Sequence, residues 1–255
     1  MARSINIIVP IYNEDESVLV WLQQLVSYLG IVDRLVVVDA SDTSTAGDLS
    51  SHAIFQQDQV FYLSSNKGRA VQMNAGAEFL LSRIDDEQVA SNILWFLHSD
   101  SGLSYLHLRY LSQLKRDVKW GRFDVQLRTD LEVHAKRFPF SVFSDFKFFC
   151  FIVAKFINLR SRLTQVMTGD QGIFIRSDIF KQLGGYADIP LMEDVEISKR
   201  LRVLAKADCN GPVLQTSARR WQKHGWIKTV LLMWQLRLMY WLGVSPEVLV
   251  KKYYG

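Results

Sequence analysis

The chain of 255 residues contains only two cysteines, and it lacks the long uninterrupted apolar runs of membrane proteins. Cys150 and Cys209 stand far apart without the spacing of a metal site or a disulfide framework, so we expect two buried, reduced thiols. The first residues lead directly into an apolar strand pattern, which predicts no signal peptide and a cytoplasmic protein. Hydrophobic residues make up 49% and charged residues 22%, a balance that excludes global disorder.

Three short motifs of common enzyme classes are also missing. Without a Gly-x-x-x-x-Gly-Lys-Ser/Thr loop the chain is not a P-loop kinase or ATPase. The absence of Gly-x-Gly-x-x-Gly after the first strand argues against a dehydrogenase, and the absence of Gly-x-Ser-x-Gly argues against a serine hydrolase of that type.

The net charge of +4 favours phosphate-bearing ligands or an anionic membrane face. No basic stripe or reader motif accompanies this charge, so we expect no nucleic-acid partner.

Two apolar, aromatic stretches, residues 138–159 and 230–244, do not meet the requirements of a membrane span. Charged residues interrupt the first, and the second is shorter than the roughly 20 residues that a spanning helix needs and contains Arg237. Two interpretations stay open: both stretches are core helices, or they lie in a membrane interface as a peripheral contact.

The remaining pattern alternates strands and helices. Apolar runs typical of buried parallel strands occupy residues 5–11, 34–39, 60–63 and 93–97. Helical periodicity occupies residues 14–29, 70–83 and 105–115. The second half shows strand patterns at residues 121–128 and 172–176, an aromatic helical region, a helix opening near Glu193 and an apolar helix at residues 226–242. This order predicts an α/β fold with a mostly parallel sheet, whose ligands bind at the carboxyl ends of the strands.

Carboxylates stand where such ligands bind. Asp39 and Asp100 each follow a buried strand, and His98 precedes Asp100. Mg²⁺ and Mn²⁺ take one or two carboxylates and fill the other positions with diphosphate and water, so Asp100 is a candidate metal ligand, with His98 as a second ligand or a positioning neighbour. Asp39 could accept a hydrogen bond from a nucleotide base. Loop capping is the alternative role for both aspartates.

Glu193 and Asp194 open a helix pattern after a proline turn. The helix dipole would stabilise acids there without any catalytic role. Adjacent acids in a pocket can also tune one another's pKa toward that of a general base. We assign Asp194 as a base that deprotonates an acceptor hydroxyl and Glu193 as the residue that orients it.

Further polar residues cluster in short segments whose simpler explanations are helix caps, tight turns and solvated basic loops. The end of the first strand offers a wall for a base and ribose through Pro10, Tyr12 and Glu14. The second helix start could fold over a sugar-diphosphate through Asn66, Gly68, Arg69 and Asn74. A glycine-flanked turn carries Asp170 and Gln171. A late basic loop could clamp the diphosphate, stack on a sugar and complete a metal shell through Arg219, Arg220, Trp221 and His224.

In this order the motifs resemble family 2 glycosyltransferases of the GT-A fold, and within them the bacterial subgroup associated with radical-SAM/selenodomain proteins. The resemblance covers nearly the whole chain. It is carried by IVPIYNE at residues 8–14, VVD at 37–39, GRAVQMNAGA at 68–77, LHSD at 97–100, GDQ at 169–171, PLMEDVE at 190–196 and TSARRW at 216–221.

The resemblance implies a Rossmann-like, mostly parallel central sheet flanked by helices, with a C-terminal helical region. It implies one domain, residues 1–255, in which residues 1–118 bind the nucleotide sugar and residues 119–255 face the acceptor. The donor would be a UDP- or GDP-sugar, the cofactor Mg²⁺ or Mn²⁺, and the usual outcome inversion. Asp39 would contact the base, Asp100 the metal, and Asp194 would be the base catalyst.

Two departures from the family pattern matter. His98-Ser99-Asp100 stands where Asp-x-Asp is usual, and no glycine follows in the turn after Asp39. The incomplete Asp-x-Asp motivates one rival function, a catalytically silent nucleotide-sugar-binding protein. The other rival is a nucleotidyltransferase, which shares the parallel sheet and the need for a metal. The acceptor is not identified by any residue; a lipid-linked acceptor at the inner face of the membrane is one expectation.

Overall fold

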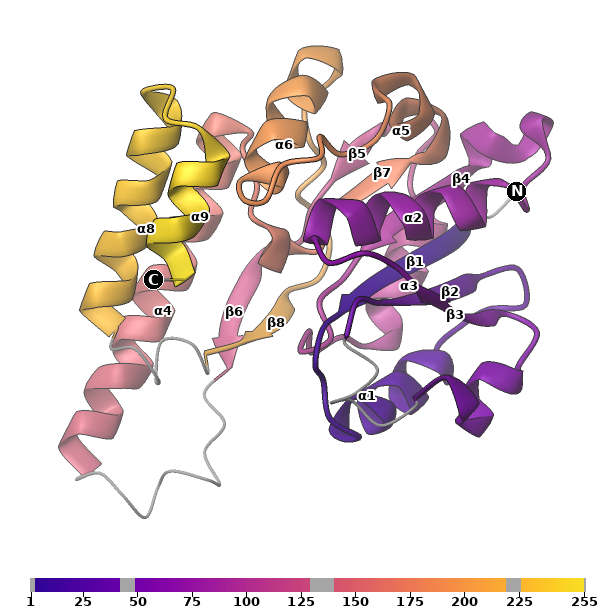
Figure 1. Ribbon diagram of the computed structural model, residues 1–255, viewed down its shortest axis with the longest axis horizontal. Helices are drawn as coiled ribbons and strands as arrows, with labels where there is room; N and C mark the ends of the chain where they lie inside the picture. The colour runs from indigo at the N-terminus through magenta and orange to yellow at the C-terminus, as the bar shows by residue number, and fades with distance from the viewer. Residues whose placement is uncertain (1–2, 42–48, 129–139, 219–225, 255) are drawn as a thin grey trace.

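A computed structural model describes residues 3–41, 49–128, 140–218 and 226–254 (Figure 1). The strands of the described residues are β1 (Ser4–Ile11), β2 (Arg34–Asp39), β3 (Val60–Ser64), β4 (Asn92–Phe96), β5 (Trp120–Gly121), β6 (Val125–Arg128), β7 (Phe174–Arg176) and β8 (Leu214–Ser217). The helices are α1 (Ser17–Val26), α2 (Arg69–Leu81), α3 (Tyr105–Ser112), α4 (Phe140–Thr164), α5 (Ser177–Leu183), α6 (Glu193–Leu204), α8 (Trp226–Trp241) and α9 (Pro246–Tyr254). Short 3₁₀ turns are η1 (Leu49–Ser51), η2 (Ala53–Gln56), η3 (Asp86–Ser91) and η4 (Gly169–Gln171).

The main sheet confirms the predicted mostly parallel α/β fold. Its strand order is β3-β2-β1-β4-β7-β5. The strands β1 to β4 pair in parallel, and β7 runs antiparallel to both β4 and β5. Ile11 pairs with Asp39 and Asp39 with Ser64, so the carboxyl ends of β1, β2 and β3 lie level with one another.

Alternating side chains of the strands are buried on opposite faces of the sheet. Residues such as Ile7 and Val37 pack against α1 and α3, whereas Ile8 and Val38 pack against α2, α5 and α6 (Figure 1). The approach of α2 is close because it carries Gly76. An added Cβ there would lie 2.7 Å from Ile8 and 2.8 Å from Val38. These contacts bring the start of α2 to the carboxyl edge of the sheet.

The second half adds a smaller sheet and the C-terminal helices. The strands β6 and β8 pair in parallel, and α4 packs on β6 through Cys150 and Ala154. The helices α8 and α9 join the start of α6 in a cluster around Leu236 and Leu249. Within the described ranges, no helix has the length and apolarity to span a bilayer. Cys150 and Cys209 are both free and buried, as expected.

Two local expectations need correction. The first helix starts at Ser17 rather than residue 14, because the Asp15 carboxylate accepts a hydrogen bond from the Ser17 N–H (2.9 Å). The strand expected at residues 121–128 is split between two sheets. The residues between β5 and β6 form hydrogen bonds with other segments: the Arg122 N–H donates to the Asp208 carbonyl and the Phe123 N–H to the Gln171 carbonyl. The helices α5 and α9 were not predicted, because their seven and nine residues are too few to show a period.

Candidate active site

The candidate site lies along the carboxyl edge of the parallel strands, and its first group surrounds Asp39. This side chain is 7% exposed. One carboxylate oxygen accepts hydrogen bonds from the Ser41 N–H (2.8 Å) and hydroxyl (2.5 Å), and the other accepts from the Tyr62 hydroxyl (2.6 Å). The Ser41 hydroxyl in turn accepts from the Asn13 N–H (2.6 Å). Asp39 is therefore held in one orientation beside the loop that follows β1.

The loop after β1 carries a second group. The Lys67 ammonium donates to the Tyr12 hydroxyl (2.9 Å) and lies 4.1 Å from the centre of its ring, while Tyr12 is 39% exposed. The side-chain amide of Gln72 donates to the carbonyls of Ile11 (2.7 Å) and Val38 (2.8 Å). Gln72 thus ties α2 to the ends of two strands, a role that the sequence analysis did not assign.

Glu14 connects this loop to the end of β4. Its carboxylate accepts a hydrogen bond from the Ser99 hydroxyl (2.8 Å), and Ser99 stands between His98 and Asp100. Asp100 is half-buried. On the same side, Pro10 is half-buried, and Asn66 is exposed just before α2.

Arg69 is the centre of the site. One terminal nitrogen of its guanidinium donates to His98 Nε2 (2.5 Å), and the other lies 3.5 Å from a carboxylate oxygen of Glu193. The guanidinium lies directly over Gly169, where an added Cβ would be 1.9 Å from Nη2. Gly68 precedes Arg69 with φ 147°, a conformation that favours glycine, and so turns the chain into α2 at this point.

The charges around Arg69 determine which groups are ionised. Burial by itself would lower the pKa of Arg69, but the carboxylates of Glu193, Asp194 and Asp170 raise it above its ordinary value. Burial and the charge of Arg69 lower the pKa of His98 well below its ordinary value. His98 is therefore neutral near pH 7 and accepts the hydrogen bond from Arg69 at Nε2. Its approach of 3.6 Å to Asp170 is consequently not an ion pair.

The two acids at the start of α6 have different surroundings. Glu193 is 5% exposed; burial and the neighbouring Asp194 raise its pKa, against the opposing effect of Arg69. Asp194 is half-buried, and its carboxylate accepts hydrogen bonds from the N–H groups of Gly169 (2.8 Å) and Val195 (2.7 Å). Asp194 thus has a fixed carboxylate with partial access to solvent, which suits a base better than the enclosed Glu193.

Two arginines from the C-terminal half complete the group, and neither was proposed from the sequence. Burial lowers the pKa of Arg160, on α4, to about 10, and it also lowers the pKa of Arg237, on α8; Asp194 opposes both effects. One terminal nitrogen of Arg160 donates to the Val166 carbonyl (3.0 Å), and the other is buried without a hydrogen-bond partner among the described residues. For Arg237, the sequence offered one indication of a role in the site, since it is a single arginine within the apolar stretch at residues 230–244.

Two proposed residues bond to neighbouring segments. The Asn74 amide donates to the Tyr186 carbonyl (2.8 Å) and accepts from the Tyr186 N–H (2.9 Å). The Gln171 side chain is fully buried and donates to the Ser161 hydroxyl (2.9 Å). Both brace segments that lead to the site. The predicted residues of the late basic loop lie outside the described residues, namely Arg219, Arg220, Trp221 and His224.

The side chains of the site could hold a metal ion only together with oxygen atoms of a bound diphosphate and water. In the part of the chain that the structure describes, no group of three or more His, Cys, Asp or Glu side chains could hold a metal ion. His98 Nε2 already accepts a hydrogen bond from Arg69. Asp100 alone, with diphosphate oxygens and water, is still a ligand set of the kind that Mg²⁺ takes.

Neither a protein-family model nor a curated protein matches this sequence. Solved structures do match its fold. The mannosyltransferase PcManGT from Pyrobaculum calidifontis, in complex with GDP-Man and Mn²⁺, superimposes with a TM-score of 0.56 at 14% identity, over 93% of this chain and 61% of that one. TarS from S. aureus gives a TM-score of 0.54 at 14% identity, over 84% and 36%. The chain has the GT-A fold.

A third match of this fold is glucosyl-3-phosphoglycerate synthase from Mycobacterium tuberculosis, in complex with Mn²⁺, UDP and glucosyl-3-phosphoglycerate. Its TM-score is 0.53 at 14% identity, over 95% of this chain and 80% of that one. The chain spans less than two thirds of the length of PcManGT and of TarS. Within its own GT-A fold, the site described above lies at the carboxyl edge of β1, β2 and β4 and at the start of α6.

Proposed function

We propose that the chain is a glycosyltransferase that moves a sugar from a UDP- or GDP-sugar to an acceptor hydroxyl with inversion. The observation that carries this proposal is the position of Arg69 between His98 and Glu193. It joins the end of β4, where a donor diphosphate would bind, to the start of α6, where the base candidate stands. The ligands named with the GT-A structures, GDP-Man and UDP, support a nucleotide-sugar donor. Membership of family 2, and of the radical-SAM-associated subgroup, belongs to the same proposal.

On the donor side, residues 1–118 would hold the nucleotide sugar. The fixed carboxylate of Asp39 would accept a hydrogen bond from the base, and Tyr12 would flank the base or ribose. Arg69 would bind the diphosphate, because it is a cation with a buried Nε that has no hydrogen-bond partner among the described residues. Asp100 would hold a divalent cation, which supplies positive charge to the leaving diphosphate when bound.

On the acceptor side, residues 119–255 would present the hydroxyl to Asp194. The carboxylate takes the hydroxyl proton, and the oxygen bonds to the anomeric carbon as the bond to the diphosphate breaks on the opposite face. The two backbone N–H groups that hold Asp194 keep its oxygens in place for this transfer. Glu193 would act through Arg69, with which it forms an ion pair.

The test is the Asp194→Asn variant, measured by release of UDP or GDP from a panel of nucleotide sugars with and without Mn²⁺. Loss of the base should reduce turnover by about 10²–10⁴-fold. Donor binding, read as a rise in the melting temperature, should persist because Asp194 is assigned to the acceptor side. Asp188→Asn is the matched control, since Asp188 is an exposed acid on the loop before α6. Turnover of Asp194→Asn close to that of the unmodified chain would reject the base assignment.

The same panel separates the rival functions. Binding of nucleotide sugars without turnover for any acceptor would indicate a silent binding protein, which the sparse metal ligands of the described residues favour as the second candidate. Release of pyrophosphate from a nucleoside triphosphate would indicate a nucleotidyltransferase. A cytoplasmic location and a lipid-linked acceptor at the inner membrane face complete the proposal.

A further inference from the structure

The helix α8 presents an apolar stripe to solvent. The stripe consists of Leu231 (60% exposed), Trp234 (66%), Leu238 (56%) and Trp241 (75%) on the helix, and Leu242 (66%) directly after its last residue. The Leu242 N–H still donates to the Leu238 carbonyl, so the helical turn continues through this residue. At 3.6 residues per turn, these five side chains fall within an arc of about 100° on the helix. Single exposed apolar side chains are ordinary on protein surfaces, but a continuous apolar stripe with two tryptophans indicates an interaction surface.

The opposite face of α8 is anchored. Leu236 is fully buried and Thr229 is 5% exposed. Leu236 packs in one cluster with Met192 and Val195 from the start of α6 and with Leu249 from α9. The exposed stripe is therefore held at a fixed place on the molecule and does not belong to a loose terminal helix.

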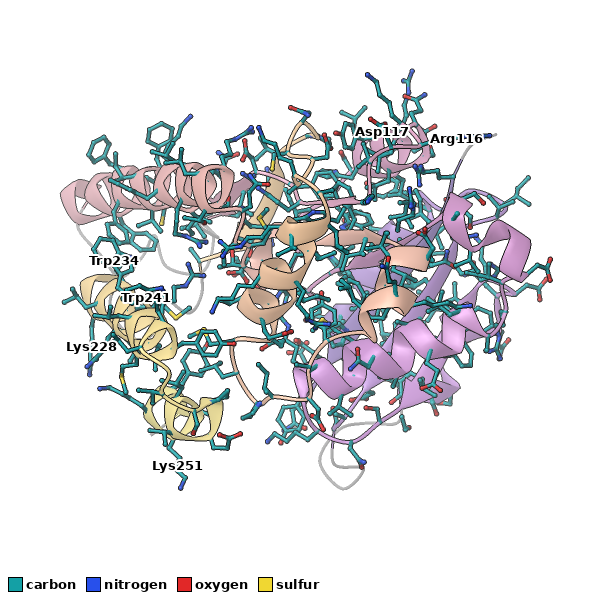
Figure 2. The ribbon with its side chains drawn as sticks, turned by 90° about the horizontal axis from the view of Figure 1, so that it is seen from above. Arg116, Asp117, Lys228, Trp234, Trp241 and Lys251 are labelled. Atoms are coloured by element: carbon teal, nitrogen blue, oxygen red, sulfur yellow. The ribbon has the colours of Figure 1, made fainter. Side chains whose placement is uncertain are left out.

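Exposed lysines lie on α8 itself and on the neighbouring helix α9. The sequence of α8 contains no Asp or Glu, and Lys228 stands on its first turn. Lys251 and Lys252 are exposed on the last turn of α9. Figure 2 shows Trp234, Trp241, Lys228 and Lys251 on the C-terminal helices, at the other end of the molecule from Arg116 and Asp117. Apolar and aromatic side chains next to lysines complement a surface that has an apolar interior and an anionic rim.

We propose that the α8 stripe docks into the surface of an anionic phospholipid bilayer, with Lys228 and Lys251 at the headgroups. Tryptophan favours the boundary between headgroups and acyl chains, because its ring is largely apolar and its N–H is polar. A helix of 16 residues is about 24 Å long, so it lies in the interface rather than crossing it. A second copy of the chain is a poorer occupant, since a symmetric contact would bring two lysine-bearing surfaces together.

The docked helix would also form part of the candidate site. Leu236 of α8 packs with Met192 and Val195, which flank the acid pair at the start of α6. Arg237 lies about 60° around α8 from Trp234 and interacts electrostatically with Asp194 and Asp170. The docked surface would thus lie beside the proposed base. This last step rests on the proposed function, and it favours an acceptor presented at the membrane surface. The docking itself does not depend on catalysis.

The test is co-sedimentation of the full chain with phosphatidylcholine vesicles that do or do not contain phosphatidylglycerol. We expect binding to the anionic vesicles. Trp234→Ala combined with Trp241→Ala should lower the partition coefficient by about tenfold or more, because two large apolar side chains are lost from the interface. Lys228→Gln and Lys251→Gln should each lower it by about fivefold on anionic vesicles only. Val20→Ala combined with Ile31→Ala is the matched control. Val20 on α1 and Ile31 in the turn before β2 are 69% and 99% exposed, and α1 lies away from α8 (Figure 1).

Three results would overturn the docking. They are no sedimentation with anionic vesicles, equal loss of binding in the control pair, or a dimer in solution that the tryptophan changes convert to a monomer. Nucleotide release without vesicles should stay unchanged in the tryptophan variants, since neither tryptophan belongs to the site. Vesicle binding by a chain that releases no nucleotide would reject the proposed function and leave the docking intact.

Discussion

The replacement Gly169→Ala tests whether Arg69 holds the site together. The new Cβ would lie 1.9 Å from Nη2 and 2.6 Å from Cζ of Arg69, far inside van der Waals contact. Gly169 does not have a positive φ, so alanine strains no backbone there. The guanidinium is the end of a flexible side chain and should move away while the fold stays intact. The methyl group therefore displaces the Arg69 guanidinium without removing its charge.

The expected cost follows from the contacts that the displacement breaks. Arg69 loses its 2.5 Å hydrogen bond to His98, and a bond to a charged group contributes about 1.5–3 kcal/mol. Its ion pair with Glu193 is 3.5 Å long and its side chain is 34% exposed, so this pair adds little. Replacing glycine by alanine also stabilises the folded state by about 0.4–1 kcal/mol, because it reduces the conformational entropy of the unfolded chain. The net destabilisation should be about 1–2 kcal/mol.

Urea unfolding of four proteins forms the assay: the unmodified chain, Gly169→Ala, Arg69→Ala and the double variant. If the methyl group acts through Arg69, its cost should nearly vanish when Arg69 is already absent. The coupling energy should then equal most of the single-variant cost. Donor-induced rises in melting temperature should be lost in both single variants. Additive costs in the double variant would refute the reasoning.

Two further predictions concern protonation and packing. In the unmodified chain the folded-state pKa of His98 lies below its ordinary 6.5, so the unfolded state binds the proton first and the free energy of unfolding falls as the pH drops below 6.5. His98→Gln keeps an acceptor for Arg69 but does not titrate, so its unfolding free energy should fall less steeply over that range; parallel curves would contradict the assignment. Gly76→Ala should destabilise the chain by about 1–2 kcal/mol despite a better helix propensity, because its Cβ would overlap Ile8 and Val38. A rise in its thermal stability would show that α2 can move off the sheet.

The helix α6 illustrates what the sequence shows locally and what it omits. An acid pair after a proline turn predicted a helix start at Glu193, and the helix begins there. The bond from the Gly169 N–H to Asp194 was not predictable, because it depends on a segment 25 residues away. The left-handed conformation of Met192 (φ 70°) was not predicted either. The catalytic roles of both acids remain predictions.

The amino-acid sequence by itself determined where the parallel strands run and which carboxylates follow them. The run at residues 34–39 was predicted to the residue, because burial on both faces demands a continuous apolar stretch that a local pattern reveals. Only the tertiary structure placed β7 antiparallel between β4 and β5, and only it brought Arg69 to His98 and Glu193. It also brought Arg160 and Arg237 into electrostatic interaction with Asp194. Periodicity reports which face of an element is buried, whereas contacts between distant elements are decided by how those faces pack together.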